Sequence, residues 1–163
     1  MFCLCFAVNF LFAEAQQDLP TDYLSPSFHK GRREAARNLM PDSSVLVVFA
    51  APSRTFANDV TYLYHQNPDL YYFTGYKEPN SVLLIFKEWQ TANDGSKFNE
   101  LFFVQKKDPR QEQWTGRRLG AEGVKSNLGI DNVMTADQFK SFAWKTPAVR
   151  NFLFELPDGI ETE

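Results

Sequence analysis

Two histidines, His29 and His65, are the side chains of this chain best suited to acid–base chemistry near neutral pH or to metal binding. His29 stands beside Lys30, and no second histidine or carboxylate is placed at an interval that metal ligands use. We therefore expect His29 at a surface or helix-cap position. His65 lies in a polar and aromatic stretch, where we expect a buried hydrogen-bonding residue. A catalytic base is the alternative for His65.

Other catalytic signatures are missing from the sequence. It contains no Gly-x-Ser-x-Gly motif of the kind that presents a nucleophilic serine. No Gly-Lys-Ser/Thr sequence follows Gly116 or Gly120 to make a phosphate-binding loop. The carboxylates are scattered along the chain rather than paired. From these residues we predict no catalytic residue, no metal site and no cofactor in this chain.

The composition describes an ordinary globular protein of one domain. Its 163 residues are enough for one sizeable core and too few for two. Hydrophobic residues make up 44% and charged residues 23%, which excludes a disordered chain. An aromatic share of 15% favours a sheet-rich core. The net charge of -3 gives no reason to expect nucleic acid as a partner.

The first residues differ in character from the rest. Residues 2–12 are apolar apart from one asparagine, and Ala-Glu-Ala follows, so we predict a signal peptide over residues 1–15, although no Lys or Arg precedes the apolar run. Export to the periplasm or the outside of the cell follows from this prediction. Residues 16–24 would form a polar N-terminal arm. Because Cys3 and Cys5 lie in the predicted signal peptide, the mature domain would have no disulfide.

A helix is predicted to begin at Ser25-Pro26, where a hydroxyl N-cap is followed by proline at the first helical position. It would end before Pro41. Two faces are expected from the spacing of its residues. The apolar face contains Phe28, Ala35, Ala36 and Leu39, and the solvent face contains Lys30, Arg33, Glu34 and Arg37.

The rest of the chain predicts one mixed β-sheet with flanking helices. The unbroken apolar run 45–50 is typical of a central strand buried on both faces. Residues 52–59 read as a loop, and Asp94-Gly95 indicates a hairpin turn within 91–97. Further strands are expected at residues 70–74, 81–86, 101–104 and 151–156, and helices at 121–128 and 136–144. The fold class is therefore α/β, in a single domain.

Four separate pieces of the sequence carry a family resemblance. They are residues 49–52 (Phe-Ala-Ala-Pro), 66–75 (Gln-Asn-Pro-Asp-Leu-Tyr-Tyr-Phe-Thr-Gly), 78–79 (Glu-Pro) and 114–120 (Trp-Thr-Gly-Arg-Arg-Leu-Gly). In this order they resemble the N-terminal domain of aminopeptidase P, in the creatinase/prolidase group. The resemblance implies that residues 25–163 form a creatinase/prolidase N-terminal domain, and it makes residues 62–80 a strand-turn-strand signature of that domain.

The resemblance also implies where the chemistry is located. Members of the family carry two divalent metals, usually Mn²⁺, in a C-terminal catalytic domain, and this chain ends at Glu163 before such a domain would begin. The chain would then be the non-catalytic N-terminal domain of a secreted Xaa-Pro metalloaminopeptidase. Its expected partners are its own catalytic domain, a peptide with proline at the second position, and further copies of itself in a homo-oligomer.

Trp114 is the one residue to which the resemblance gives a substrate role. It matches a family tryptophan that projects toward the active-site groove, often that of a neighbouring subunit. The alternative is a core tryptophan buried behind the hairpin. Two other functions stay open from the sequence. The parent protein could be a proline dipeptidase or creatinase-like hydrolase, or the chain could be a stand-alone binding module.

Overall fold

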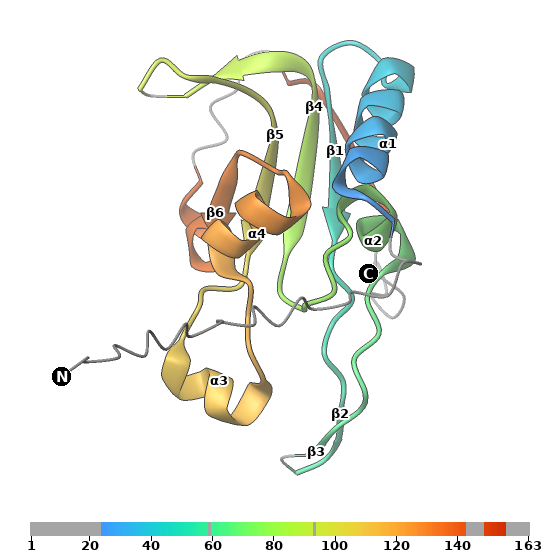
Figure 1. The fold of residues 1–163 in the computed structure, drawn as a ribbon. Helices are drawn as coiled ribbons and strands as arrows, with labels where there is room; N and C mark the ends of the chain where they lie inside the picture. The colour runs from blue at the N-terminus through green and yellow to red at the C-terminus, as the bar shows by residue number, and fades with distance from the viewer. Residues whose placement is uncertain (1–23, 59, 93, 143–148, 156–163) are drawn as a thin grey trace, which may run out of the picture.

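The computed structural model describes residues 24–58, 60–92, 94–142 and 149–155 (Figure 1). The predicted signal peptide, residues 1–15, lies outside these ranges, as does the predicted arm except for its last residue. Among the described residues, no helix combines the length and the apolar character that a membrane span requires.

A mixed sheet of five strands forms the centre of the domain and confirms the predicted α/β class. The strand order is β6-β5-β4-β1-β7, with β4 antiparallel to both of its neighbours and the outer strands β6 and β7 parallel to theirs. The strands are β1 (Ser44–Phe49), β4 (Val82–Thr91), β5 (Lys97–Val104), β6 (Val133–Thr135) and β7 (Asn151–Phe154).

Both faces of the sheet are buried, and strands β1, β4 and β5 each contribute to two cores, because alternate residues of a strand point to opposite faces. In β4, Leu83 and Ile85 pack into one core, while Leu84 and Phe86 pack into the other. The first core lies beneath helices α1 (Pro26–Leu39), α2 (Pro68–Thr74) and α4 (Gly120–Leu128), which cover one side of the sheet in Figure 1. The 3-10 helix η1 (Ala136–Ser141) packs on the second through Phe139.

Helix α1 begins where the sequence predicts, with the Ser25 side chain as its N-cap, but several of its side chains lie on the opposite face from the one predicted. Arg33 and His29, which were predicted to be exposed, have only 0% and 2% of their surface accessible, and Leu39 from the predicted apolar face is 88% exposed. The prediction was wrong because the helix packs through hydrogen bonds and charge rather than through an apolar stripe.

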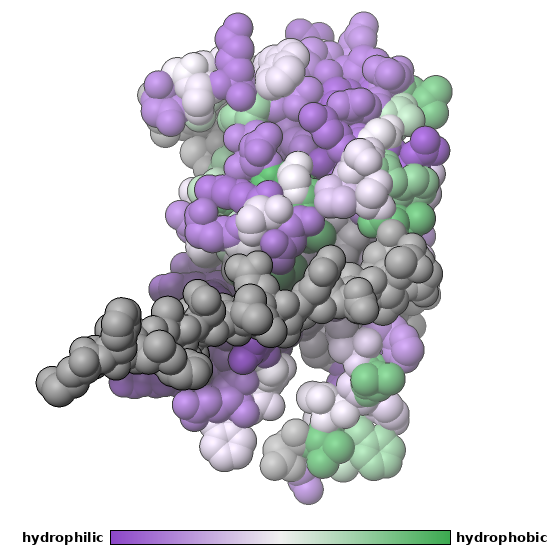
Figure 2. Space-filling view, in the orientation of Figure 1, coloured by the Kyte–Doolittle hydropathy of each residue, from purple (hydrophilic) through white to green (hydrophobic). Residues whose placement is uncertain are grey.

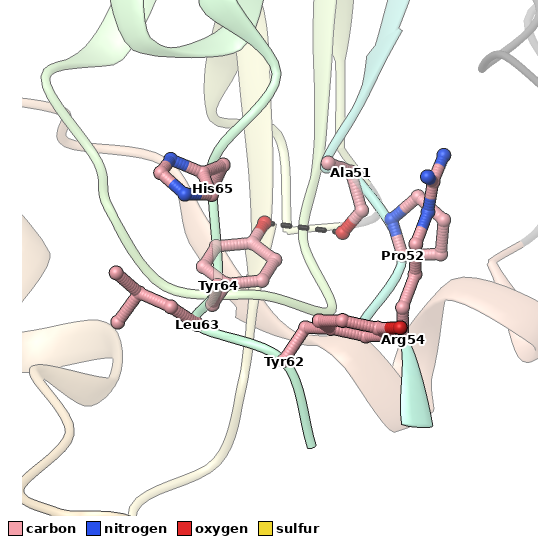
Figure 3. Close-up of a pocket in the computed structure, with 7 residues that line it drawn as sticks. All are labelled: Ala51, Pro52, Arg54, Tyr62, Leu63, Tyr64 and His65. Carbon is pink, nitrogen blue, oxygen red and sulfur yellow. Dashed lines mark hydrogen bonds between the residues drawn. The ribbon is translucent and has the colours of Figure 1, made fainter. Parts of the chain in front are cut away.

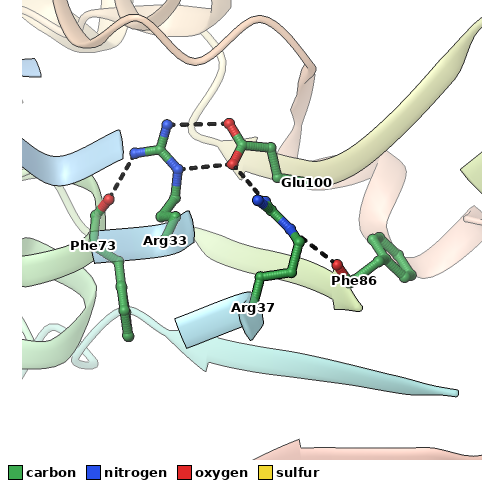
Figure 4. A network of polar contacts seen from close by, with 5 residues as sticks. All are labelled: Arg33, Arg37, Phe73, Phe86 and Glu100. Carbon is green, nitrogen blue, oxygen red and sulfur yellow. Dashed lines mark hydrogen bonds and ion pairs between the residues drawn. The ribbon is translucent and has the colours of Figure 1, made fainter. Parts of the chain in front are cut away.

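Figure 4 shows the polar network that replaces this stripe. The Arg33 guanidinium donates to both carboxylate oxygens of Glu100 on β5, at 2.9 and 3.1 Å, and to the carbonyl oxygen of Phe73 at 2.8 Å. Arg37 donates to Glu100 at 3.2 Å and to the carbonyl oxygen of Phe86 at 3.1 Å. The buried positive charges are therefore paired, as burial requires.

Helix α2 replaces the strand predicted at residues 70–74. The Asn67 side chain accepts from the backbone N–H of Asp69, Pro68 occupies the first turn, and Gly75 ends the helix in the left-handed conformation with φ 72°. These are helix start and stop signals, and they outweigh the β-propensity of the aromatic residues between them. Residues 62–80 are therefore a loop, a short helix and a turn, not a strand-turn-strand unit.

Three further differences concern shorter elements. The predicted loop 52–59 includes β2 (Thr55–Ala57), which pairs with β3 (Val60–Thr61) in a separate hairpin. Helix α3 (Pro109–Thr115) and strand β6 were not predicted, and η1 is a 3-10 helix that lies within the predicted helix 136–144. The turn at Asp94-Gly95, helix α4 and the described part of strand 151–156 agree with the sequence.

Candidate functional site

Trp114 stands on helix α3 with 89% of its surface exposed. In Figure 1, α3 and the β2–β3 hairpin both extend beyond the same end of the sheet. An indole in this position is not part of the core, so the alternative of a buried tryptophan behind the hairpin is wrong. Its role toward a substrate stays a prediction.

Hydrogen bonds at its N-terminus define where helix α3 begins. The Asp108 carboxylate accepts from the N–H groups of Arg110 and Gln111 at 3.0 and 3.4 Å, and Pro109 follows it at the first helical position. The Glu112 carboxylate accepts from the Asp108 N–H at 3.1 Å. No residue of α3 is buried. The helix forms locally and then presents its side chains to the surroundings.

Glu78 connects α3 and α4 to the loop that follows α2. One carboxylate oxygen accepts from the backbone N–H of Leu119 at 2.8 Å, and the other accepts from the hydroxyl of Tyr76 at 2.8 Å. Glu78 of the piece 78–79 is thus linked to Leu119 of the piece 114–120, and its carbonyl oxygen also accepts from Gln66 of the piece 66–75. Sequence reasoning did not find the contact with Leu119, since its partners are 41 residues apart.

A second hydrogen-bonding centre is Gln66. Its side-chain oxygen accepts from the N–H groups of Ala51 and Asn67 at 3.2 and 2.8 Å, and its amide nitrogen donates to the carbonyl oxygen of Glu78 at 2.8 Å. The Asn67 amide donates to the carbonyl oxygen of Phe49 at 2.9 Å. The side chains of Gln66 and Asn67 thus bind backbone groups of the pieces 49–52 and 78–79 and hold the three pieces together.

His65 is exposed, which contradicts the prediction of a buried hydrogen-bonding residue. It lines an open cleft of about 570 Å³ between the segment that precedes β2 and the segment that follows β3 (Figure 3). The cleft is lined by Ala51, Pro52, Arg54, Tyr62, Leu63, Tyr64 and His65. These residues include no carboxylate to orient the imidazole and no nucleophile for it to activate, so the cleft lacks the parts of a catalytic site.

Tyr64 closes one side of this cleft. Its hydroxyl lies 3.1 Å from the carbonyl oxygen of Ala51 and 2.8 Å from the side-chain oxygen of Gln66, and its single proton can be donated to one of them at a time. Burial raises the pKa of Tyr64 to about 12. The hydroxyl is therefore protonated near neutral pH and serves as a donor within the fold.

His29 is placed where it cannot serve as a ligand. Its Nδ1 lies 2.8 Å from the carbonyl oxygen of Tyr72, and because a carbonyl only accepts, this nitrogen carries the proton. The opposite nitrogen faces Gly75, where an added Cβ would lie only 2.8 Å from it. Among the described residues, no three His, Cys, Asp or Glu side chains are grouped closely enough to hold a metal ion.

Apolar side chains are also exposed on the hairpin. Phe56, Val60 and Leu63 are each more than half exposed, and the Phe56 ring packs edge to face against Tyr62 with centroids 5.2 Å apart. Figure 2 shows apolar surface at this end of the molecule. The hairpin thus exposes aromatic and aliphatic groups, which are suited to contact rather than to catalysis.

Comparison with known proteins gives a consistent result. The model of the family described as "Aminopeptidase P, N-terminal domain" matches residues 29–150. The chain is 39% identical over 130 residues to Xaa-Pro aminopeptidase of Escherichia coli, covering 80% of this chain and 26% of that protein. It is 34% identical over 113 residues to intermediate cleaving peptidase 55 of Schizosaccharomyces pombe, covering 69% and 22%.

Solved structures agree with the sequence comparison. Aminopeptidase P from Escherichia coli with the inhibitor Pro-Leu superposes with a TM-score of 0.69 at 30% identity, covering 80% of this chain and 29% of that chain. A Pseudomonas aeruginosa aminopeptidase gives a TM-score of 0.65 at 26% identity, covering 73% and 26%. The chain thus spans about a quarter of the length of these relatives.

Proposed function

The chain belongs to the aminopeptidase P N-terminal domain family, and from this premise we propose that it works as the non-catalytic N-terminal domain of a longer Xaa-Pro aminopeptidase. The relative with 39% identity is named for this activity, and the match covers 26% of its length. Peptides with proline at the second position are the proposed substrates of the whole protein.

The proposed division of labour places hydrolysis outside this chain. The described residues offer no set of side chains that fits a metal ion. We assign the two divalent metals, Mn²⁺ by the family resemblance, to a C-terminal catalytic domain, which is the first proposed partner. This chain would shape the groove into which the peptide enters and would contribute contacts between subunits of a homo-oligomer.

The exposed indole of Trp114 is the observation that carries this proposal. Tryptophan is large, apolar and costly to leave in water, and an indole that is 89% exposed on a helix without buried residues has no packing role among the residues that the structure describes. A flat indole can form a wall for an extended peptide and donate one hydrogen bond to it. We therefore propose Trp114 as a substrate-binding residue.

The test is Trp114→Ala in the longer protein, with Trp89→Ala as the matched control, because Trp89 is also exposed but lies on β4. We expect kcat/KM for an Xaa-Pro-Xaa tripeptide to fall about tenfold in the first variant and to stay unchanged in the second. Unchanged kcat/KM for Trp114→Ala would overturn the substrate role.

The same assay distinguishes the other parent proteins. An aminopeptidase prefers the tripeptide, whereas a proline dipeptidase cleaves the Xaa-Pro dipeptide and a creatinase-like hydrolase cleaves neither. Cleavage of the dipeptide alone would overturn the proposed activity. If the chain is made in cells without a catalytic domain attached, the stand-alone binding module replaces the proposal.

Export is a further part of the proposal, and it depends on the apolar N-terminal sequence with its Ala-Glu-Ala ending. N-terminal sequencing of the protein purified from its source should begin at Gln16. A mature protein that retains Met1 and stays inside the cell would contradict export. Light scattering of the longer protein measures the proposed homo-oligomer, and a monomer would exclude it.

A further inference from the structure

Helix α3 carries Trp114 without being packed into the domain. None of its residues is buried, and its N-terminal hydrogen bonds are local to residues 108–112. Burial of the residues of α3 therefore cannot determine where the indole stands. The contact that can do so lies at the other end of α3, in the segment that leads into α4.

This segment has a glycine in a left-handed conformation at each end. Gly116 follows α3 with φ 82° and Gly120 opens α4 with φ 62°, both in the region that favours glycine. An added Cβ on Gly120 would lie 3.1 Å from the Cβ of Lys107, so the segment passes close to the end of β5. Between the two glycines, the Leu119 N–H donates to Glu78.

Glu78 is well placed to hold this N–H. Its second carboxylate oxygen accepts from the hydroxyl of Tyr76, which is completely buried in the first core. Its backbone carbonyl accepts from the side chain of Gln66. Burial of Tyr76, and after it the charge of Glu78, raise the pKa of Tyr76, which keeps its hydroxyl a donor. The carboxylate thus joins a buried part of the core to a segment that also contacts the first core through the side chain of Leu119.

Arg118 adds to this arrangement. It is adjacent to Leu119 in sequence, and its Nε is buried without a hydrogen-bond partner among the described residues. Its positive charge acts on Tyr76 in the direction opposite to that of Glu78. The segment therefore carries a buried guanidinium nitrogen next to the N–H that Glu78 accepts.

We propose that Glu78 is a positioning residue, which determines where Trp114 stands by holding the backbone N–H of Leu119. The consequence for catalysis depends on the proposed function of Trp114, whereas the positioning itself does not. Glu78 touches no reacting atom in this proposal and acts only through the α3–α4 connection.

The experiment compares three variants of the longer protein. Glu78→Ala removes both acceptor oxygens, and Glu78→Gln keeps one oxygen for the Leu119 N–H. The control is Glu88→Ala, because the Glu88 carboxylate also accepts a backbone N–H, that of Ser43 at 2.8 Å, but has no connection to α3. Hydrogen exchange at the Leu119 amide and steady-state kinetics on an Xaa-Pro-Xaa tripeptide are measured for each.

We expect Glu78→Ala to speed exchange at Leu119 by about tenfold or more, as for the loss of a bond to a charged acceptor. KM for the tripeptide should rise with kcat unchanged. Glu78→Gln should restore both values, and Glu88→Ala should change neither. Adding Trp114→Ala to Glu78→Ala should raise KM no further than Trp114→Ala alone, because both act through the same indole.

Two results would overturn the proposal: unchanged exchange at Leu119 in Glu78→Ala, or an equal rise in KM in Glu88→Ala, which would show general destabilisation. If Trp114→Ala itself leaves KM unchanged, the substrate role of Trp114 fails. In that case the exchange measurement alone still decides whether Glu78 holds the segment.

Discussion

Helices α1 and α3 both lie at the surface of the domain, but α1 buries polar side chains, whereas α3 exposes an apolar one. Helix α1 buries Arg33 and His29, and hydrogen bonds join these to Glu100 and to the carbonyl end of α2. Helix α3 buries nothing and leaves its tryptophan in water. A charged residue, Arg33, is thus buried on α1, and an aromatic residue, Trp114, is exposed on α3.

The difference separates stability from recognition. In α1, the side chains whose burial would be costly are paired and so fix the helix on the sheet. In α3, the side chain whose exposure is costly has no partner within the described residues of the domain. The α1 region should therefore be sensitive to substitution in unfolding experiments, and the α3 region should be sensitive in binding experiments.

The largest expected effect is that of Arg33→Met. It removes the bidentate partner of Glu100 and the donor to the Phe73 carbonyl, and we expect it to lower the free energy of unfolding by about 3–5 kcal/mol. The neighbouring Arg32→Met is the control, because exposed Arg32 contacts only the face of Phe28 in the described contacts and should cost about 1 kcal/mol or less. Urea denaturation measures both, and equal costs would contradict a structural role for the network.

Next in size is Gly75→Ala, which tests how closely α1 and α2 approach. Alanine would have to adopt φ 72°, and its Cβ would lie 2.8 Å from Nε2 of His29. We expect a loss of about 2–4 kcal/mol from the two causes together. Gly95→Ala has a similar φ of 84° but meets no atom within 4 Å, so only the backbone cost of about 1 kcal/mol should appear.

A double-mutant cycle separates these two causes. In a His29→Ala background the clash is removed, and the cost of Gly75→Ala should fall to that of Gly95→Ala. Equal costs of Gly75→Ala in both backgrounds, measured by thermal or urea unfolding, would show that His29 does not constrain this glycine.

The pH dependence of stability is a smaller test of the same packed region. The pKa of Tyr64 rises on folding from 10.0 to about 12, and that of Tyr76 also rises, so the native state favours the protonated hydroxyls. Their stabilisation is complete below about pH 10 and is lost as the pH rises through the folded pKa. The unfolding free energy should therefore fall above about pH 10, and less steeply in Tyr64→Phe. The same slope in both proteins would contradict this assignment.

The strands were predictable because their apolar runs report burial directly. Residues 45–50 and 101–104 contain little else, and both form strands of the central sheet. The run at 70–74 was misleading, since its aromatic residues favour a strand while Asn67, Pro68 and Gly75 favour a capped helix. Local chemistry at the two ends decided the structure.

The candidate site was predictable only in part. The sequence singled out Trp114 through its resemblance to a family, but helix α3 was not predicted, although its Asp108-Pro109 pair is a typical helix start. The contact between Glu78 and Leu119 and the pairing of Arg33 with Glu100 join residues 41 and 67 positions apart. No periodicity in a helix or strand specifies such partners, so a spacing rule assigned Arg33 to the solvent face.

The smallest expected effect on stability is that of Trp114→Ala, and it tests whether the side chain that α3 exposes contributes to the stability of the fold. The indole is 89% exposed, so its removal gives up little buried area, and alanine is the better helix former at that position. The free energy of unfolding should change by less than about 0.5 kcal/mol in urea denaturation. A loss above about 1 kcal/mol would mean that the indole packs against the domain in solution, because exposed side chains do not contribute that much. Helix α3 would then belong with α1 among the elements that hold the fold together, and the contrast between the two helices would no longer hold.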